Sequence, residues 1–255
     1  MRRQLAALRR IPARALWKVA PRRTVHTRGL RFTLQCDNWI THYRWSTYNT
    51  KEPETLDWID GWAGDGQVFF DIGANIGVFT IYAALRHPQA RIIAFEPEYA
   101  NLHLLRDNVI RNQLQKRVEV YSIALSNRNG LSQLHIQDVT PGAALHTESR
   151  TALRQTKSAK AVVWHEGIGT FTLDHFCEEM QVAPTQLKID VDGTEQDILE
   201  GGSRTLRASA LQSLMMEMYQ ESSQRNTCER LLKVAGLRRE WSQPERCDNE
   251  IWVRS

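Results

Sequence analysis

The stretch QVFFDIGANIG, residues 67–77, decides the fold. Its first half is apolar and predicts a short buried strand that ends at Asp71. Gly73 and Gly77 then allow a tight turn and a close approach of the backbone to a ligand. Apolar residues at helical spacing follow until a His-Pro pair at 87–88, which ends the helix. A strand, a glycine turn and a helix in this order predict the first unit of a parallel α/β sheet.

The same alternation of strands and helices continues to the C-terminus. Residues 92–95 predict a second buried strand closed by Glu96, and Pro97 suits the first position of the next helix. Asp174 is expected to cap a short helix. We therefore predict one α/β sheet with helices on both faces. Further strands are expected at 118–120, 134–136, 162–164, 171–173, 187–189 and 214–216, with a closing antiparallel pair at 237–241 and 251–253.

The first 31 residues differ in charge from the rest of the chain. They hold ten of the 33 Lys and Arg residues and no acid, so the remainder carries 23 basic against 29 acidic residues. We predict a basic tail over residues 1–30 and one folded domain over residues 31–255. The tail is amphipathic and is interrupted near Pro12. A solvated appendage, a segment that binds an anionic membrane surface and an organelle transit peptide are three alternatives for it.

The length of the apolar runs and the spacing of the cysteines indicate the cellular compartment in which the protein is expected. No apolar run approaches the roughly 20 residues that a membrane span needs, and arginines interrupt the apolar residues at the N-terminus. We expect a soluble, cytoplasmic protein, with contact to the inner membrane surface through the tail as the alternative. The cysteines Cys36, Cys177, Cys228 and Cys247 form no CxxC pair, which favours reduced thiols over disulfides or a zinc site.

Four acids stand at predicted strand ends, namely Asp71, Glu96, Asp190 and Glu217. Ligands of open α/β sheets bind beyond the carboxyl ends of the strands, so these acids should share one rim. S-adenosylmethionine carries a sulfonium and an ammonium, which acids attract. A dinucleotide would instead bring its negative pyrophosphate toward Asp71, and Asn75 replaces the second glycine of the GxGxxG loop. We therefore predict S-adenosylmethionine as the cofactor.

The position of these residues at the carboxyl ends of the strands also predicts which of them contact the cofactor. The turn at 73–77 should approach the ligand, and Glu96 should hold both ribose hydroxyls. Ala124, at the end of the third strand, should border the adenine. The predicted cofactor-binding residues are Asp71, Gly73, Asn75, Gly77, Glu96 and Ala124.

Five motifs together resemble the FkbM family of methyltransferases, over roughly residues 50–220. The resemblance implies a seven-stranded Rossmann-like fold with an antiparallel last strand. It also implies O-methylation of a hydroxyl on a sugar, glycolipid or polyketide-type small molecule. Asp192 departs from the family, which commonly has Glu at this position. The motifs are DIGANIG at 71–77, Glu96-Pro97, ALS at 124–126 before Gly130, TLD at 172–174 and LKIDVDGTE at 187–195.

Asp190 is the acid best placed for chemistry, because it ends a central strand on the rim. It could accept the proton of the acceptor hydroxyl, or join Asp192 or Glu195 in holding a divalent cation. We favour the mechanism without a metal, since Asp192 and Glu195 have the spacing of a helix capping box and hard cations want about six oxygen ligands. The predicted catalytic residues are Asp190, His175 and Glu195.

Three other functions compete with this interpretation. The first is a nucleic-acid base N-methyltransferase, which would usually show an Asn/Asp-Pro-Pro-aromatic run after the fourth strand. This chain has the sequence DVDG there, at residues 190–193. The acidic charge of residues 32–255 also opposes the binding of phosphate groups. The second is an NAD-dependent oxidoreductase on the same scaffold, and the third is a scaffold or adaptor that binds no cofactor. We expect a small-molecule or glycan acceptor and no nucleic acid, and the oligomeric state stays open.

Overall fold

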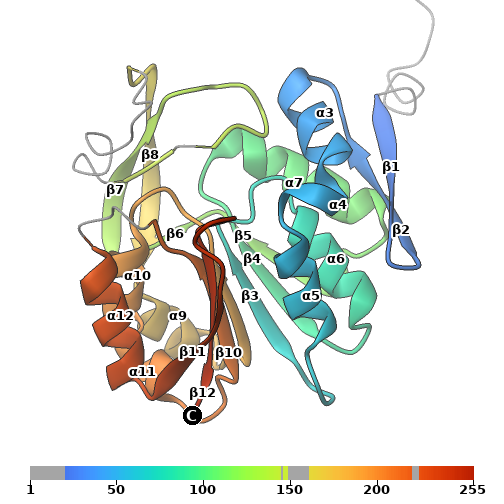
Figure 1. Cartoon of the computed structure of the whole chain (residues 1–255). Helices are drawn as coiled ribbons and strands as arrows, with labels where there is room; N and C mark the ends of the chain where they lie inside the picture. The colour runs from blue at the N-terminus through green and yellow to red at the C-terminus, as the bar shows by residue number, and fades with distance from the viewer. Residues whose placement is uncertain (1–20, 145, 149–160, 220–223) are drawn as a thin grey trace, which may run out of the picture.

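The large sheet has seven strands in the order β11-β12-β10-β9-β3-β4-β5. The computed structural model describes residues 21–144, 146–148, 161–219 and 224–255 (Figure 1). Strands β10, β9, β3, β4 and β5 run parallel, while β12 lies antiparallel to β10 and to β11. This arrangement confirms the predicted Rossmann-like sheet with an antiparallel last strand. The strands are β3 (Val68–Ile72), β4 (Arg91–Phe95), β5 (Val118–Tyr121), β9 (Gln186–Ile189), β10 (Ser213–Glu217), β11 (Leu237–Ser242) and β12 (Asn249–Arg254).

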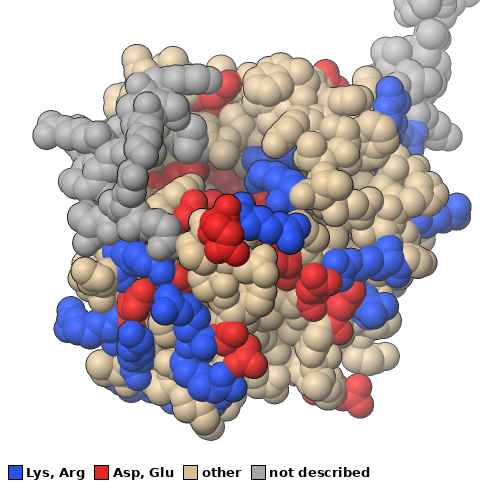
Figure 2. All heavy atoms as spheres, in the orientation of Figure 1, with Lys and Arg blue, Asp and Glu red and all other residues tan. Residues whose placement is uncertain are grey.

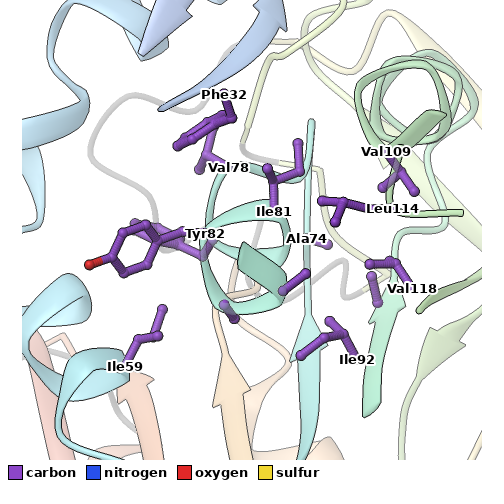
Figure 3. Close-up of a cluster of buried hydrophobic side chains, with 14 of the residues drawn as sticks. Phe32, Ile59, Ala74, Val78, Ile81, Tyr82, Ile92, Val109, Leu114 and Val118 are labelled. Carbon is purple, nitrogen blue, oxygen red and sulfur yellow. The ribbon is translucent and has the colours of Figure 1, made fainter. Parts of the chain in front are cut away.

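Helices cover both faces of this sheet because successive side chains of a strand point to opposite faces. Phe69 belongs to the apolar cluster on the side of α5, α6 and α7, and Phe70 to the cluster on the side of α9 to α12. Figure 3 shows Ile81 and Tyr82 of α6 within the first cluster. The helices are α3 (Trp39–Ser46), α4 (Tyr48–Lys51), α5 (Pro53–Asp60), α6 (Val78–Arg86), α7 (Tyr99–Arg111), α9 (Leu173–Glu179), α10 (Glu195–Gly201), α11 (Ser203–Arg207) and α12 (Arg225–Val234).

An N-terminal hairpin precedes these layers. Strand β1 (Arg22–Thr27) pairs antiparallel with β2 (Leu30–Gln35), and Phe32 and Leu34 are buried in the cluster of α6 and α7. The predicted boundary after residue 30 falls inside this hairpin, at the start of β2. Residues 1–20 of the predicted tail lie outside the described residues.

A second, three-stranded sheet lies beside the first, in the order β6 (Ala124–Leu125), β8 (Trp164–Phe171), β7 (Gly130–Ile136). The two strands predicted at 162–164 and 171–173 are wrong, since one continuous strand spans most of that stretch and pairs along its length with β7. Ala124 belongs to this small sheet and not to the third strand of the large one.

Helix α7 begins two residues later than predicted. Glu98 caps it, because its carboxylate accepts hydrogen bonds from the backbone N–H groups of Ala100 (2.9 Å) and Asn101 (2.6 Å). Pro97 therefore precedes the cap and is not the first helical residue.

The cap of α9 is also different from the predicted one. The Thr172 hydroxyl accepts from the backbone N–H of His175 (3.1 Å), so Thr172 caps the helix. Asp174 instead lies in its first turn and accepts from the N–H groups of Arg204 (2.9 Å) and Thr205 (2.7 Å) at the start of α11. Its carboxylate thus ties two neighbouring helices together.

Within the described ranges, no helix is both long enough and apolar enough to cross a bilayer.

Candidate active site

A cavity of about 220 Å³ opens where the parallel strands end. Figure 2 shows acidic side chains at the bottom of a hollow near the middle of the drawn face, with basic side chains beside them. The lining residues come from strand ends, from α3 and α4, and from the segment after β7. They are Arg44, Lys51, Glu52, Gly73, Asn75, Glu96, Pro97, Asn101, Leu134, Ala143, Ala144, His146, Asp190, Val191, Asp192, Glu217, Tyr219 and Asn249.

A smaller apolar cavity of about 50 Å³ adjoins the first and shares Gly73 and Pro97 with it. Phe95, Ile123 and Ala124 are among its walls. This is the kind of surface that a flat aromatic base would occupy. A larger depression of about 830 Å³ lies over β7 and β8, but none of the described residues that line it is a strand-end acid of the large sheet. We therefore place the site at the strand ends.

The glycine turn after β3 brings two strand ends together. Gly73 has φ +81°, and a Cβ there would lie 2.0 Å from the carbonyl oxygen of Asp190. Only glycine lets the turn approach β9 this closely. Gly77 has φ +83° and packs against Leu105 of α7, where a Cβ would lie 2.3 Å from Cδ1. Gly73 lines the cavity, whereas Gly77 is not among the described lining residues and holds α6 against α7.

Asn75 and Glu96 connect this turn to β4. Asn75 adopts φ +50°, and its backbone N–H donates to the Glu96 carboxylate at 2.7 Å. The N–H of Glu98 donates to the other oxygen of Glu96 at 3.0 Å. Burial raises the pKa of Glu96 to about 8, although these N–H groups oppose the shift. Both residues line the cavity, as their predicted contact with a cofactor requires.

Asp71 lies below the turn, not on the cavity surface. It is 1% exposed, and one oxygen accepts from the Thr80 hydroxyl at 2.5 Å. The other oxygen has no hydrogen-bond partner among the described residues, and burial raises the pKa of Asp71. Because Asp71 is not among the described lining residues, its geometry suits a support for the turn, and its contact with a cofactor stays a prediction.

Asp190 reaches the cavity from the end of β9. Its carboxylate accepts from the Lys188 ammonium at 2.6 Å, with the Asp190 side chain 39% exposed and that of Lys188 only 3%. Burial opposes the negative charge, but the Lys188 ammonium lowers the pKa of Asp190. Asp190 is therefore ionised at neutral pH.

Glu217 lies beside Asp190, because β10 and β9 are paired up to the residues just before them. Its carboxylate accepts from the Tyr219 hydroxyl at 2.8 Å, and no cation within the described chain lies in ion-pair contact with it. Burial, helped by the charge of Asp190, raises the pKa of Glu217 to about 7. The two neighbouring acids thus differ in how readily they take a proton.

The predicted capping box between Asp192 and Glu195 is wrong. Thr194 is the cap of α10, without a side-chain hydrogen bond. Glu195 accepts from the backbone N–H of Gly193 at 3.2 Å, and Asp192 accepts from that of His146 at 3.1 Å. Asp192 is therefore held toward the cavity by the segment after β7, not by its own helix.

Two of the three predicted catalytic residues are not brought into this cavity. Glu195 is 7% exposed beneath the loop, where burial raises its pKa to about 8. His175 lies on α9, and its ring stacks on Phe171 with centroids 5.8 Å apart. Neither is among the described lining residues, whereas Asp190 is. A catalytic role for Glu195 and His175 remains a prediction without support from this geometry.

Three charged residues of the site were not predicted from the sequence. Arg44, Lys51 and Glu52 come from α3, α4 and the residue after α4, and no motif marks them. The side chains of Asn75 and Asn101 both donate to the carbonyl of Ala143, in the segment after β7, at 2.8 and 3.1 Å. Among the described residues no cluster of three or more His, Cys, Asp or Glu is arranged to hold a metal ion.

Three proteins with similar sequences are methyltransferases by name. One is "31-O-demethyl-FK506 methyltransferase FkbM" of Streptomyces tacrolimicus, 29% identical over 156 residues that cover 53% of this chain and 59% of the relative. Another is "2-O-methyltransferase NoeI" of Sinorhizobium fredii, 30% identical, covering 54% and 58%. "Methyltransferase sdnD" of Sordaria araneosa is 27% identical and covers 68% and 76%. The chain thus spans about three fifths of the length of the first two relatives.

Solved structures agree in fold. A methyltransferase FkbM from Methylobacillus flagellatus superposes with a TM-score of 0.50 at 14% identity, covering 86% of this chain and 55% of that one. A SAM-dependent methyltransferase from Agrobacterium tumefaciens gives 0.51 at 9% identity, covering 92% and 70%.

A family match shows the relationship, because it covers most of the chain, including the glycine turn and the cavity acids Glu96, Asp190, Asp192 and Glu217. The model described as "Methyltransferase FkbM domain" matches residues 71–237, well over half of the chain. The chain therefore belongs to the FkbM family of methyltransferases.

Proposed function

We propose that the protein transfers the methyl group of S-adenosylmethionine to a hydroxyl oxygen of a sugar, glycolipid or polyketide-type acceptor. The observation that carries the proposal is the acid-lined cavity beside the glycine turn at the strand ends. Acids favour a ligand that carries a sulfonium and an ammonium, and disfavour a pyrophosphate. Two relatives named as O-methyltransferases support oxygen as the acceptor atom.

The residues of the two cavities fit such a cofactor. Glu96 has its carboxylate held by two backbone N–H groups and can accept hydrogen bonds from ribose hydroxyls. The smaller cavity with Ala124 in its wall suits the adenine. Gly73 lines both cavities, so the turn after β3 borders the two parts of the proposed cofactor site.

The acceptor would lie over Asp190 and Glu217. When bound, S-adenosylmethionine supplies a methyl group that is already activated, so the protein must orient the hydroxyl and take its proton. Asp190 is ionised and held by Lys188, which suits it to orient the hydroxyl or accept its proton. Glu217 is free of cations in ion-pair contact within the described chain and is available to share the proton.

Calorimetry of the purified protein with S-adenosylmethionine and, separately, with NAD tests this proposal. We expect saturable binding of the first ligand and none of the second. NAD binding without S-adenosylmethionine binding would favour the oxidoreductase alternative. Mass spectrometry of candidate glycans and glycolipids, after incubation with labelled cofactor, would then identify the acceptor.

Replacement of Glu96 by Ala should weaken the binding of S-adenosylmethionine by about 1–3 kcal/mol, the range for polar groups left without a partner. The ribose would lose its acceptor, and the N–H groups of Asn75 and Glu98 would lose theirs. Titration calorimetry measures the change. Glu119→Ala is the matched control, because Glu119 is an acid on β5 that pairs with Arg91 away from the cavity. Equal affinities of the Glu96 variant and the wild type would remove Glu96 from the site.

Turnover should rise with pH around neutrality and then level off. A proton acceptor works only when it is unprotonated, and the pKa of Glu217 is raised to about 7, so activity is lost as pH falls through that value. Glu217→Gln should abolish this limb of the pH profile and lower the plateau. Rates between about pH 5.5 and 9 give the profile. A limb that persists in the variant assigns the titration to another group.

We also propose that residues 1–20 bind anionic membrane surfaces, on the basis of six Lys and Arg residues without an acid. Deletion of residues 1–20, which leaves β1 intact, should move the protein from anionic liposomes to the supernatant in a flotation assay. Neutral liposomes serve as the control. Equal flotation of both forms would refute the proposal.

A further inference from the structure

Arg44 lines the cavity but has no role in the cofactor binding or proton transfer proposed so far. It lies on α3, and its Nε donates to the carbonyl of Gly142 at 2.7 Å. The backbone N–H of Gly142 in turn donates to the Asn101 side chain at 2.7 Å, so the anchor of Arg44 is itself fixed. Nε is thus engaged, while neither terminal nitrogen donates a hydrogen bond to a described residue, and Arg44 lines the cavity.

The other cations at this site already have carboxylate partners. Lys51 lies 2.5 Å from Glu52, and Lys188 lies 2.6 Å from Asp190. No carboxylate of the described chain lies within ion-pair distance of Arg44. Burial lowers the pKa of the Arg44 guanidinium, although four acids act in the opposite direction through space. Arginine still keeps its charge, and a cation withdrawn from water without a partner is costly unless a ligand completes the pair.

The surrounding charge restricts what that ligand can be. Five acids line the same cavity: Glu52, Glu96, Asp190, Asp192 and Glu217. A simple anion would be repelled by them. A zwitterion with two positive groups and one carboxylate could satisfy the acids and Arg44 together, and S-adenosylmethionine has this distribution of charge.

The position of Arg44 points to the amino-acid end of the cofactor. Gly142, which holds Arg44, is followed by Ala143, whose carbonyl accepts from the Asn75 side chain at 2.8 Å. Arg44 is therefore linked through residues 142–143 to the turn after β3, and it lines the same cavity as Glu96 and Asp190. We propose that Arg44 binds the carboxylate of the methionine part of S-adenosylmethionine, an inference that rests on the function proposed above.

The chemistry of the guanidinium suits this task. Its two terminal nitrogens can donate parallel hydrogen bonds to both oxygens of one carboxylate, and such charge-assisted pairs are about twice as strong as neutral ones. Lysine at this position could supply only a point charge. The subsite comes from α3, which precedes the segment matched by the family model.

The test compares two ligands that differ only in this carboxylate. Calorimetry with S-adenosylmethionine and with decarboxylated S-adenosylmethionine should show that the wild type prefers the first by about 10- to 100-fold. Arg44→Met should bind both ligands equally, with its affinity for the decarboxylated one unchanged from the wild type. Arg44→Lys should recover part of the preference. Arg106→Met is the matched control, on the exposed side of α7, and should behave as the wild type.

Each other outcome overturns a defined part of the inference. A full preference retained in Arg44→Met would show that another group binds the carboxylate. An equal loss of affinity for both ligands would show that Arg44 only supports the fold of the site. A wild type that binds neither ligand would refute the proposed function itself, and this is seen before any variant is measured.

Discussion

Replacement of Asp190 by Asn is expected to lower turnover by on the order of a hundredfold or more, the usual contribution of a positioned base. The variant keeps the shape of the side chain and removes the charge that faces the acceptor. Affinity for S-adenosylmethionine should stay near that of the wild type, because Glu96 and the turn at 73–77 are untouched. The rate at saturating cofactor, measured on protein whose cofactor affinity has been checked, gives the result.

The Asp190→Asn variant is also expected to be less stable than the wild type. Asp190 is the 2.6 Å partner of the buried Lys188 ammonium, so the variant should also lose some thermal stability. Asp107→Asn on α7, which breaks an ion pair with Arg111 away from the cavity, is the control for stability without catalysis. Retained turnover in Asp190→Asn would assign the proton transfer to Glu217. Loss of wild-type activity in EDTA, restored by magnesium, would favour the metal-assisted mechanism.

Much of the large sheet could be predicted from the sequence because its signals are local. The apolar strand at 68–72, the turn after it and the acid that closes β4 each depend on a few adjacent residues. The rule that ligands bind at the carboxyl ends of parallel strands then brings Glu96 and Asp190 to one cavity. Both residues line it.

The remaining parts of the site depend on contacts between distant segments. Nothing adjacent to Arg44 shows that its side chain reaches the carbonyl of Gly142, 98 residues away. The spacing of Asp192 and Glu195 matched a capping box, but the N–H of His146 competes for Asp192. Asp71 sits at the end of a strand, as predicted, yet the turn folds over it and buries its carboxylate. Sequence spacing identifies such acids without showing which way they face.

The second large effect is expected from Lys188→Met, which should lower the free energy of unfolding by about 3–5 kcal/mol, the range for breaking a buried ion pair. Lys188 serves two carboxylates, since it contacts Asp190 and its charge also acts on Asp71. Asp190 is partly exposed and can be solvated when the ammonium is gone. Asp71 is 1% exposed and cannot. The loss of stability should therefore come mainly from the buried Asp71 carboxylate. Urea unfolding followed by tryptophan fluorescence measures this loss.

Two measurements distinguish the loss of the Lys188 charge from a simple loss of packing: the pH dependence of stability and the effect of a second substitution at Asp71. Without Lys188, the folded-state pKa of Asp71 should lie further above its unfolded value of about 3.9. A carboxyl with a raised folded-state pKa destabilises the fold as pH rises above the unfolded value, so the deficit of Lys188→Met should shrink as pH is lowered toward about 5. Asp71→Asn in the same background removes the charge and should restore part of the stability at neutral pH. A deficit that is independent of pH and unrelieved by Asp71→Asn would mean that Lys188 stabilises the sheet through packing against Phe79, whose ring lies 5.0 Å from its ammonium.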